Sequence, residues 1–239
     1  MPQIETSVLG QYLNSFPAWT RSQYLALLFI LSLLLLVYPF WPRSVLGLAT
    51  LDLLLWALLL ASIQAVNHSK ALLRFALALA LPTFLADLIV FTSPSRDWLL
   101  ISCLLDLGFI MFVTLVVIGN VMKQERVGTD KIFGAICGYI LLGLLWALIY
   151  GALELSFPGS FSGTLSAGLN DAPHFAGMDQ FIYYSLVTLS TLGYGDITAV
   201  THAARSLSST EALVGQLYMA ILVARLIGLH IIESRQGDA

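Results

Sequence analysis

The chain has 239 residues, of which 58% are hydrophobic and 10% are charged, and its mean hydropathy is +0.86. This composition excludes an ordinary soluble domain and indicates an integral protein of the lipid bilayer. The net charge of −3, with no basic block, gives no reason to expect a nucleic acid partner. Cys103 and Cys137 lie in apolar runs, which favours small buried or lipid-facing side chains over a disulfide or a metal site.

Residues 1–21 lack the basic start and the long apolar run of a signal peptide, so we expect them to be retained. Their apolar residues recur at helical spacing, which predicts a short helix lying in the membrane interface. A frayed terminus is the alternative.

Six segments reach the length of about 20 mostly apolar residues that a membrane-spanning helix needs. Clusters of polar or turn-forming residues separate most of them. With the amino terminus inside, the internal loops and tails hold more Lys and Arg than the external ones, so the positive-inside rule places both termini in the cytoplasm. The predicted spans are 22–40, 44–66, 70–92, 98–122, 132–155 and 206–232.

The connection between the last two spans is long and lies outside the cell in this orientation. Residues 156–177 are rich in Gly, Ser and Pro and predict an irregular extracellular loop. Residues 178–190 are apolar but too short to span, which is typical of a re-entrant helix. Asp179 in the first turn of this segment suits the positive end of the helix dipole. Residues 191–196, with the sequence TLGYGD, then interrupt the apolar pattern.

The two glycines of this interruption suit a strand whose carbonyl groups all point to one side. Gly193 and Gly195 occupy alternate positions, and glycine tolerates the backbone conformations that such a strand needs. Irregular backbone is tolerated at membrane depth only where protein or a water-filled cavity surrounds it. A row of carbonyl oxygens can replace the hydration shell of a potassium ion, as it does in potassium-channel filters.

The stretch TLSTLGYGD, residues 188–196, resembles the potassium-channel signature, and its setting between two spans is similar to the pore of six-transmembrane, tetrameric cation channels. The resemblance implies a homotetramer with four chains around one pore axis, and potassium ions in the filter without an organic cofactor. By the same resemblance, Gly195 would complete the filter. The potassium ions would be bound by oxygen atoms of Thr191, Leu192, Gly193 and Tyr194.

The resemblance also implies residues that support the filter. The ring of Tyr194 would pack outward against aromatic side chains of the pore helix, for which Tyr183 and Tyr184 are candidates. Asp196 would lie at the outer mouth, and Thr188 would support the filter from the pore helix. One residue departs from the family: Leu192 stands where Val is most common. Because the ligand at that position is a carbonyl, we expect selectivity to survive, while the effect on inactivation stays open.

Three residues of the last predicted span are candidates for roles in the pore. Gly215 is placed like the family's hinge glycine, and a glycine that permits close helix packing is the alternative. Ala220 is a candidate lining residue of the internal cavity. Glu211 lies near the depth of the filter, where an ionisable group is a functional candidate. It either hydrogen-bonds behind the filter, with its proton retained by burial, or is a carboxylate at a wet helix start.

Residues 22–122 stand where related channels carry a voltage-sensor domain. The fourth span contains no Lys or Arg, so we do not expect voltage sensing by moving arginines. Asp52, Asp87 and Asp106 are all expected in the outer half of the bilayer. They form either an acidic cluster that binds a cation or senses external pH, or separate carboxylates that reach the interface or pair with a loop arginine.

The sequence therefore predicts an all-α membrane protein of six transmembrane helices, a re-entrant pore helix and a selectivity filter, with the pore domain over residues 123–239. We expect a potassium-selective channel that catalyses no reaction and lies, multi-pass, in a prokaryotic cell membrane. About seven residues follow the last span, so gating is expected to come from the membrane, the pore itself or a regulatory partner.

Two other functions compete with this prediction. A non-selective monovalent cation channel is the closer one, and the intact Gly-Tyr-Gly sequence argues against it. The other is a membrane sensor or enzyme with a vestigial pore motif. Catalysis would need converging chemical groups, and the nearest pair, His174 and Asp171, has neither a metal-ligand spacing nor a nucleophile motif.

Overall fold

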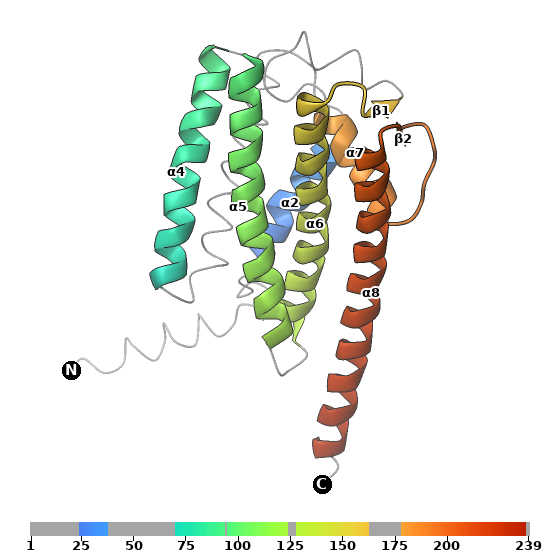
Figure 1. Cartoon of the computed structure of the whole chain (residues 1–239). Coiled ribbons are helices and arrows are strands. Elements are labelled where there is room, and N and C mark those ends of the chain that lie inside the picture. Colours follow the sequence, from blue (N-terminus) through green and yellow to red (C-terminus); the bar gives the residue numbers. More distant parts are fainter. Residues whose placement is uncertain (1–23, 38–69, 94, 124–127, 163–177, 238–239) are drawn as a thin grey trace, which may run out of the picture.

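The computed structural model of the protein describes residues 24–37, 70–93, 95–123, 128–162 and 178–237 (Figure 1). Helices dominate the described residues, and one short antiparallel strand pair adds to the predicted all-α fold. The elements in chain order are α2 (Leu25–Val37), α4 (Lys70–Thr92), α5 (Arg96–Lys123), α6 (Thr129–Ser156), β1 (Phe161–Ser162), α7 (Met178–Leu189), β2 (Thr198–Ala199) and α8 (His202–Gly237).

Four of the described helices, α4, α5, α6 and α8, are long and apolar enough to cross a membrane. The first three lie at the spans expected over 70–92, 98–122 and 132–155. The span expected over 22–40 is described only as α2, a helix of 13 residues. The span expected over 44–66 and the predicted interfacial segment at the amino terminus lie outside the described residues. The chain is an integral membrane protein.

Helices α2, α5 and α6 pack around a first apolar core. Phe109, Val113 and Val117 are fully buried and lie one helical turn apart on the same face of α5. Cys103 and Cys137 belong to this core as free, buried side chains. Both cysteines therefore serve as small core residues, as their apolar surroundings in the sequence predict.

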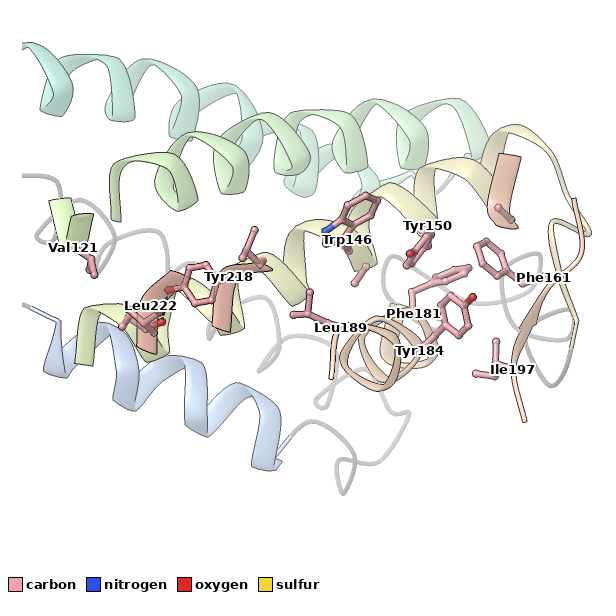
Figure 2. Packing of buried hydrophobic residues seen from close by; sticks show 14 residues of the cluster. Val121, Trp146, Tyr150, Phe161, Phe181, Tyr184, Leu189, Ile197, Tyr218 and Leu222 are labelled. Carbon is pink, nitrogen blue, oxygen red and sulfur yellow. Dashed lines mark hydrogen bonds between the residues drawn. The ribbon is translucent and has the colours of Figure 1, made fainter. Parts of the chain in front are cut away.

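A second core joins α6, α7 and α8, and aromatic rings fill one end of it (Figure 2). The ring of Tyr150 on α6 lies edge-on to the rings of Phe161 and Tyr184, with centroids 5.3 and 5.2 Å away. Phe181 of α7 contacts Phe161 in the same way at 5.5 Å. Such pairs contribute about 0.5–1.5 kcal/mol each beyond the burial of their surface. The short helix α7 is thereby fixed against α6 and β1.

A buried carboxylate closes the turn that follows α6. The side chain of Glu154, which is 5% exposed, accepts hydrogen bonds from the backbone N–H groups of Gly159 (2.7 Å), Ser160 (2.9 Å) and Phe161 (3.3 Å). Gly159 has a φ of 86°, a conformation that favours glycine. The turn therefore wraps around Glu154 and places β1 beside the start of α8.

Strand β1 lies within residues 156–177, where the sequence predicts only an irregular loop, and it pairs with β2. Phe161 pairs with Ala199 and Ser162 with Thr198, in antiparallel register. Two-residue strands give no periodic signal, which explains why sequence analysis misses them. The pairing joins the end of α6 to the segment that returns from residues 191–196.

Helix α8 begins at His202, four residues before the start that the sequence predicts. The reason is a cap: the hydroxyl of Thr201 accepts the backbone N–H of Ala204 at 3.3 Å. Ser and Thr at this position stabilise a helix start by satisfying a free N–H group. The sequence-based start of this span, at residue 206, is therefore four residues too late for the helix.

Candidate functional site

Residues 191–196 lie between the end of α7 and β2, and their backbone alternates in handedness. Thr191, Gly193 and Gly195 have φ values of 58°, 58° and 80°. An added Cβ at either glycine would meet no atom within 4 Å in the single chain. Glycine is therefore needed there for its conformation and not for lack of space. Alternating conformations of this kind let successive carbonyl groups face the same side.

The end of α7 sets the conformation of Thr191. Its N–H donates to the carbonyl of Thr188 at 2.9 Å, and the N–H of Leu192 donates to the carbonyl of Val187 at 2.9 Å. These two bonds form the common C-terminal cap in which the residue after the helix is left-handed. Glycine usually occupies that position, and a β-branched residue there is an outlier. Thr191 is the first residue of 191–196, which we call the filter stretch, and its conformation is thus fixed directly by the end of α7, the predicted pore helix.

The filter stretch is open to solvent in the single chain. Every residue from Thr191 to Asp196 is exposed, and the exposed fractions of Leu192 and Tyr194 reach 56% and 68%. The next residue, Ile197, is buried in the second core. The filter stretch is therefore fixed at Thr191 and at Ile197. Between these two ends, the side chains of Leu192 and Tyr194 are not covered by their own chain.

The two pore-helix tyrosines point to different partners. Tyr183 donates its hydroxyl to the Oδ2 atom of Asp196 at 2.7 Å. Tyr184 is buried, and its hydroxyl lies 2.7 Å from the Oγ atom of Ser208. Within the described part of the chain, Tyr194 makes no ring contact with either tyrosine. Packing of Tyr194 against these rings stays a prediction that needs a neighbouring chain.

We expect the Tyr183→Phe variant to lose ion flux at a higher pH than the wild type. The hydrogen bond from Tyr183 lowers the pKa of Asp196, which lies outside the spanning helices, below its ordinary value of 3.8. Because its pKa is lowered, Asp196 stays charged at pH values where an ordinary aspartate would already take up a proton. The hydrogen bond from Tyr183 is therefore lost only as the pH falls through the lowered pKa. Rubidium flux into liposomes, measured at external pH between about 3 and 7, checks this shift. The shift should vanish in an Asp196→Asn background, and its persistence there would contradict this cause.

Glu211 lies in a buried network that joins three helices. Its side chain is 0% exposed and contacts the hydroxyls of Tyr150 on α6 and Ser185 on α7, each at 2.5 Å. Ser185 also donates to the carbonyl of Gly143 on α6 at 2.7 Å. The structure therefore shows the buried alternative for Glu211 and not a carboxylate at a wet helix start. Its role as a support of the filter stays a prediction.

Hydrogen counting restricts the state of this network. The hydroxyl of Ser185 has one hydrogen, yet two acceptors lie within reach: the carbonyl of Gly143 and the Oε1 atom of Glu211. Both contacts form at once if Glu211 carries a proton and donates it to Ser185. Tyr150 then donates to the other oxygen of the same carboxyl group.

Gly215 lies where α8 touches the end of the pore helix. A Cβ atom at this position would lie 2.3 Å from the carbonyl oxygen of Leu189 and 3.0 Å from its Cδ1 atom. This approach supports the packing alternative for Gly215. The hydroxyl of Tyr139 reaches the same carbonyl at 3.3 Å. The hinge role is not needed to explain the glycine and stays a prediction.

Gln216, which was not among the residues predicted for the pore, contacts the filter stretch directly. Its Nε2 atom donates to the Oγ1 atom of Thr191 at 3.2 Å. Ala220, the predicted lining residue, is exposed one turn further along α8. Since residues four apart share a helix face, the placement of Ala220 in the cavity also predicts Gln216 there. The four-residue spacing between Gln216 and Ala220 is therefore the sequence signal that could have identified Gln216.

The three aspartates of the first four spans are only partly described. Asp87 is buried and accepts a hydrogen bond from Ser102 at 2.5 Å. Asp106 lies one turn from Ser102 on α5, and Asp52 lies outside the described residues. Among the described residues, no group of three or more His, Cys, Asp or Glu side chains could hold a metal ion. The acidic cluster stays a prediction.

Comparison with known proteins matches residues 138–229 to a protein family described as "Ion channel". The matched region begins within α6 and covers α7, the filter stretch and most of α8. The match shows that this part of the chain is similar to ion channels. Together with the potassium channels described below, the match indicates a channel and not an enzyme.

Three curated proteins show how far the similarity of the channel extends. Protein LctB from Bacillus caldotenax is 26% identical over 131 residues, which cover 52% of this chain and 96% of the relative. The two pore potassium channel c from Oryza sativa subsp. japonica is 37% identical over 92 residues, or 37% of this chain and 19% of the relative. The voltage-gated potassium channel Kch from Escherichia coli strain K12 is 27% identical over 165 residues, covering 68% of this chain and 35% of the relative. No solved structure matches the channel significantly.

Proposed function

We propose that the protein is a potassium-selective channel that conducts potassium passively through a filter of backbone carbonyl groups. The observation that carries this proposal is the alternation of left-handed residues at Thr191, Gly193 and Gly195 within the sequence TLGYGD. Carbonyl groups that face one side can replace the water around a dehydrated ion. Two of the similar proteins are themselves named potassium channels, which supports potassium as the ion.

The same proposal explains why the filter stretch is exposed in one chain. One copy supplies only part of each ring of ligands, so the channel acts as a homotetramer with potassium ions between the four chains. Leu192 and Tyr194, which lie uncovered in the single chain, would then meet neighbouring copies. We further propose that the channel lies in a prokaryotic cell membrane with both termini in the cytoplasm, as the distribution of Lys and Arg favours.

Gating by moving arginines is not part of the proposal. Helix α5 has Arg96 at one end and Lys123 at the other, with no Lys or Arg between them. A voltage sensor needs several charges that cross the membrane field. Helix α5 is therefore not proposed as a voltage sensor.

Ion flux into liposomes tests the proposed selectivity. Purified full-length protein should take up rubidium into potassium-loaded vesicles, with barium as a blocker, and should exclude sodium. The Gly193→Ala variant should lose this flux because alanine resists the left-handed conformation that Gly193 adopts. Gly159→Ala is the matched control, since Gly159 has a φ of 86°, lies outside the filter and has open space around it. Equal permeation of sodium and potassium would favour the non-selective channel instead.

A further inference from the structure

Gln216 is the α8 side chain that reaches the first residue of the filter. Its amide nitrogen lies 3.2 Å from the hydroxyl oxygen of Thr191, and both side chains are exposed in the single chain. The contact therefore lies on the open side of the filter stretch, away from the two apolar cores. If four chains surround a pore, as proposed above, this side faces the inner end of the filter.

The backbone of α8 is fixed on both sides of Gln216. Glu211 is buried in its network of hydroxyl groups, and Tyr218 donates to the carbonyl of Ala135 at 2.7 Å. Gly215, the preceding residue, lies against the carbonyl of Leu189 with no room for a side chain. The position of Gln216 relative to Thr191 is thus set by buried contacts and does not depend on the exposed hydrogen bond itself.

The contact with Gln216 affects which groups the hydroxyl of Thr191 can bind. A hydroxyl group has one hydrogen and two lone pairs. Gln216 donates to the hydroxyl oxygen, so one lone pair is engaged by the amide and the other is left for a cation. Thr191 is also a β-branched residue with a φ of 58°, a rare conformation in which its side chain has little freedom to find other partners.

We propose that Gln216 is a positioning residue of the filter, whose amide holds the Thr191 hydroxyl so that its oxygen faces the innermost cation. This inference rests on the proposed function, because it needs a conducted ion. Gln216 itself does not replace the hydration shell of that ion. It sets how tightly the inner end of the filter holds a partly dehydrated cation that arrives from the cytoplasmic side.

The test uses barium block of rubidium flux, because a divalent cation reports how well the ring of oxygens is oriented. In the full-length channel, Gln216→Leu removes the donor at similar volume and should weaken block by internal barium about two- to tenfold, the range expected for one lost hydrogen bond. Gln216→Glu keeps the shape but replaces the donor with an acceptor, and it should weaken the block as well. Thr210→Ala is the matched control, since Thr210 is exposed on α8 and its hydroxyl donates to Ser206 of the same helix.

A double-mutant cycle decides whether Gln216 acts through Thr191. If it does, Gln216→Leu should have no further effect in a Thr191→Val background, where no hydroxyl remains to be held. The inference would be overturned if the two substitutions weakened barium block independently, so that their fold-changes multiplied. It would also be overturned if the Gln216 variants were blocked by barium as strongly as Thr210→Ala. The wild type separates the two proposals. A wild type that fails to discriminate potassium from sodium contradicts the proposed function, whereas a selective wild type with silent Gln216 variants contradicts this inference alone.

Discussion

Replacing Glu211 with alanine is expected to destabilise the channel by about 2–5 kcal/mol and to abolish ion flux, whereas Glu211→Gln should largely keep both. Alanine leaves the buried hydroxyls of Tyr150 and Ser185 without their partner and removes packing between three helices. Glutamine has nearly the same shape. Its Oε1 atom can accept from Tyr150 while its amide donates to Ser185, which reproduces the protonated carboxyl group that hydrogen counting favours.

Thermal unfolding of the purified variants, followed by rubidium flux into liposomes, measures both effects. Glu211→Gln serves as the control for Glu211→Ala because it keeps the volume and the hydrogen-bonding groups of a neutral, protonated carboxyl group. If glutamine proved as damaging as alanine, the network would require an ionised carboxylate and the protonated arrangement would be wrong. If alanine were harmless, Glu211 would have no part in supporting the filter.

Adding one methyl group at Gly215 is expected to cost about 3 kcal/mol of stability, at the upper end of what overpacking usually costs. The Cβ atom of Gly215→Ala would approach the carbonyl oxygen of Leu189 to 2.3 Å, and a backbone atom cannot move aside as the tip of a side chain can. Helix α8 would have to leave the end of α7, carrying Gln216 away from Thr191. We therefore expect a lower unfolding temperature together with loss of flux.

Two glycines in spanning helices provide the control for Gly215→Ala. An added Cβ atom at Gly119 on α5 or Gly228 on α8 would meet nothing within 4 Å. Alanine should stabilise either helix slightly, by up to about 1 kcal/mol, because it favours the helical conformation. A Gly215→Ala protein with wild-type stability but altered opening would instead support the hinge interpretation.

Hydropathy and turn residues predict much of this architecture because each long helix must cover the bilayer with its own residues. The lengths of α4, α5 and α6 follow from local composition, and so does the short apolar helix α7. The filter stretch is also recognisable from local sequence, since its two glycines occupy alternate positions. These features depend on neighbouring residues and need no knowledge of the tertiary fold.

The contacts that hold the filter stretch could not be predicted in the same way. Tyr150 and Ser185 reach Glu211 from positions 61 and 26 residues away, and nothing local marks them as its partners. The left-handed conformation of Thr191 comes from the cap at the end of α7, against the usual preference for glycine. The strand pair β1–β2 depends on Glu154 to place β1, and its two-residue strands have no sequence pattern of their own.

The strand pair has a consequence for how the outer part of the channel can vary. Ser162 and Thr198 are 36 positions apart in the chain, and their hydroxyl oxygens lie 2.5 Å from each other. Helix α7 and the filter stretch thus belong to a loop that begins at β1, ends at β2 and is closed where these two strands pair. Doubling the length of such a loop costs only about 0.6 kcal/mol of closure entropy. The chain between β1 and α7 can therefore gain or lose residues, or carry a binding epitope, while the conformation of residues 191–196 is kept.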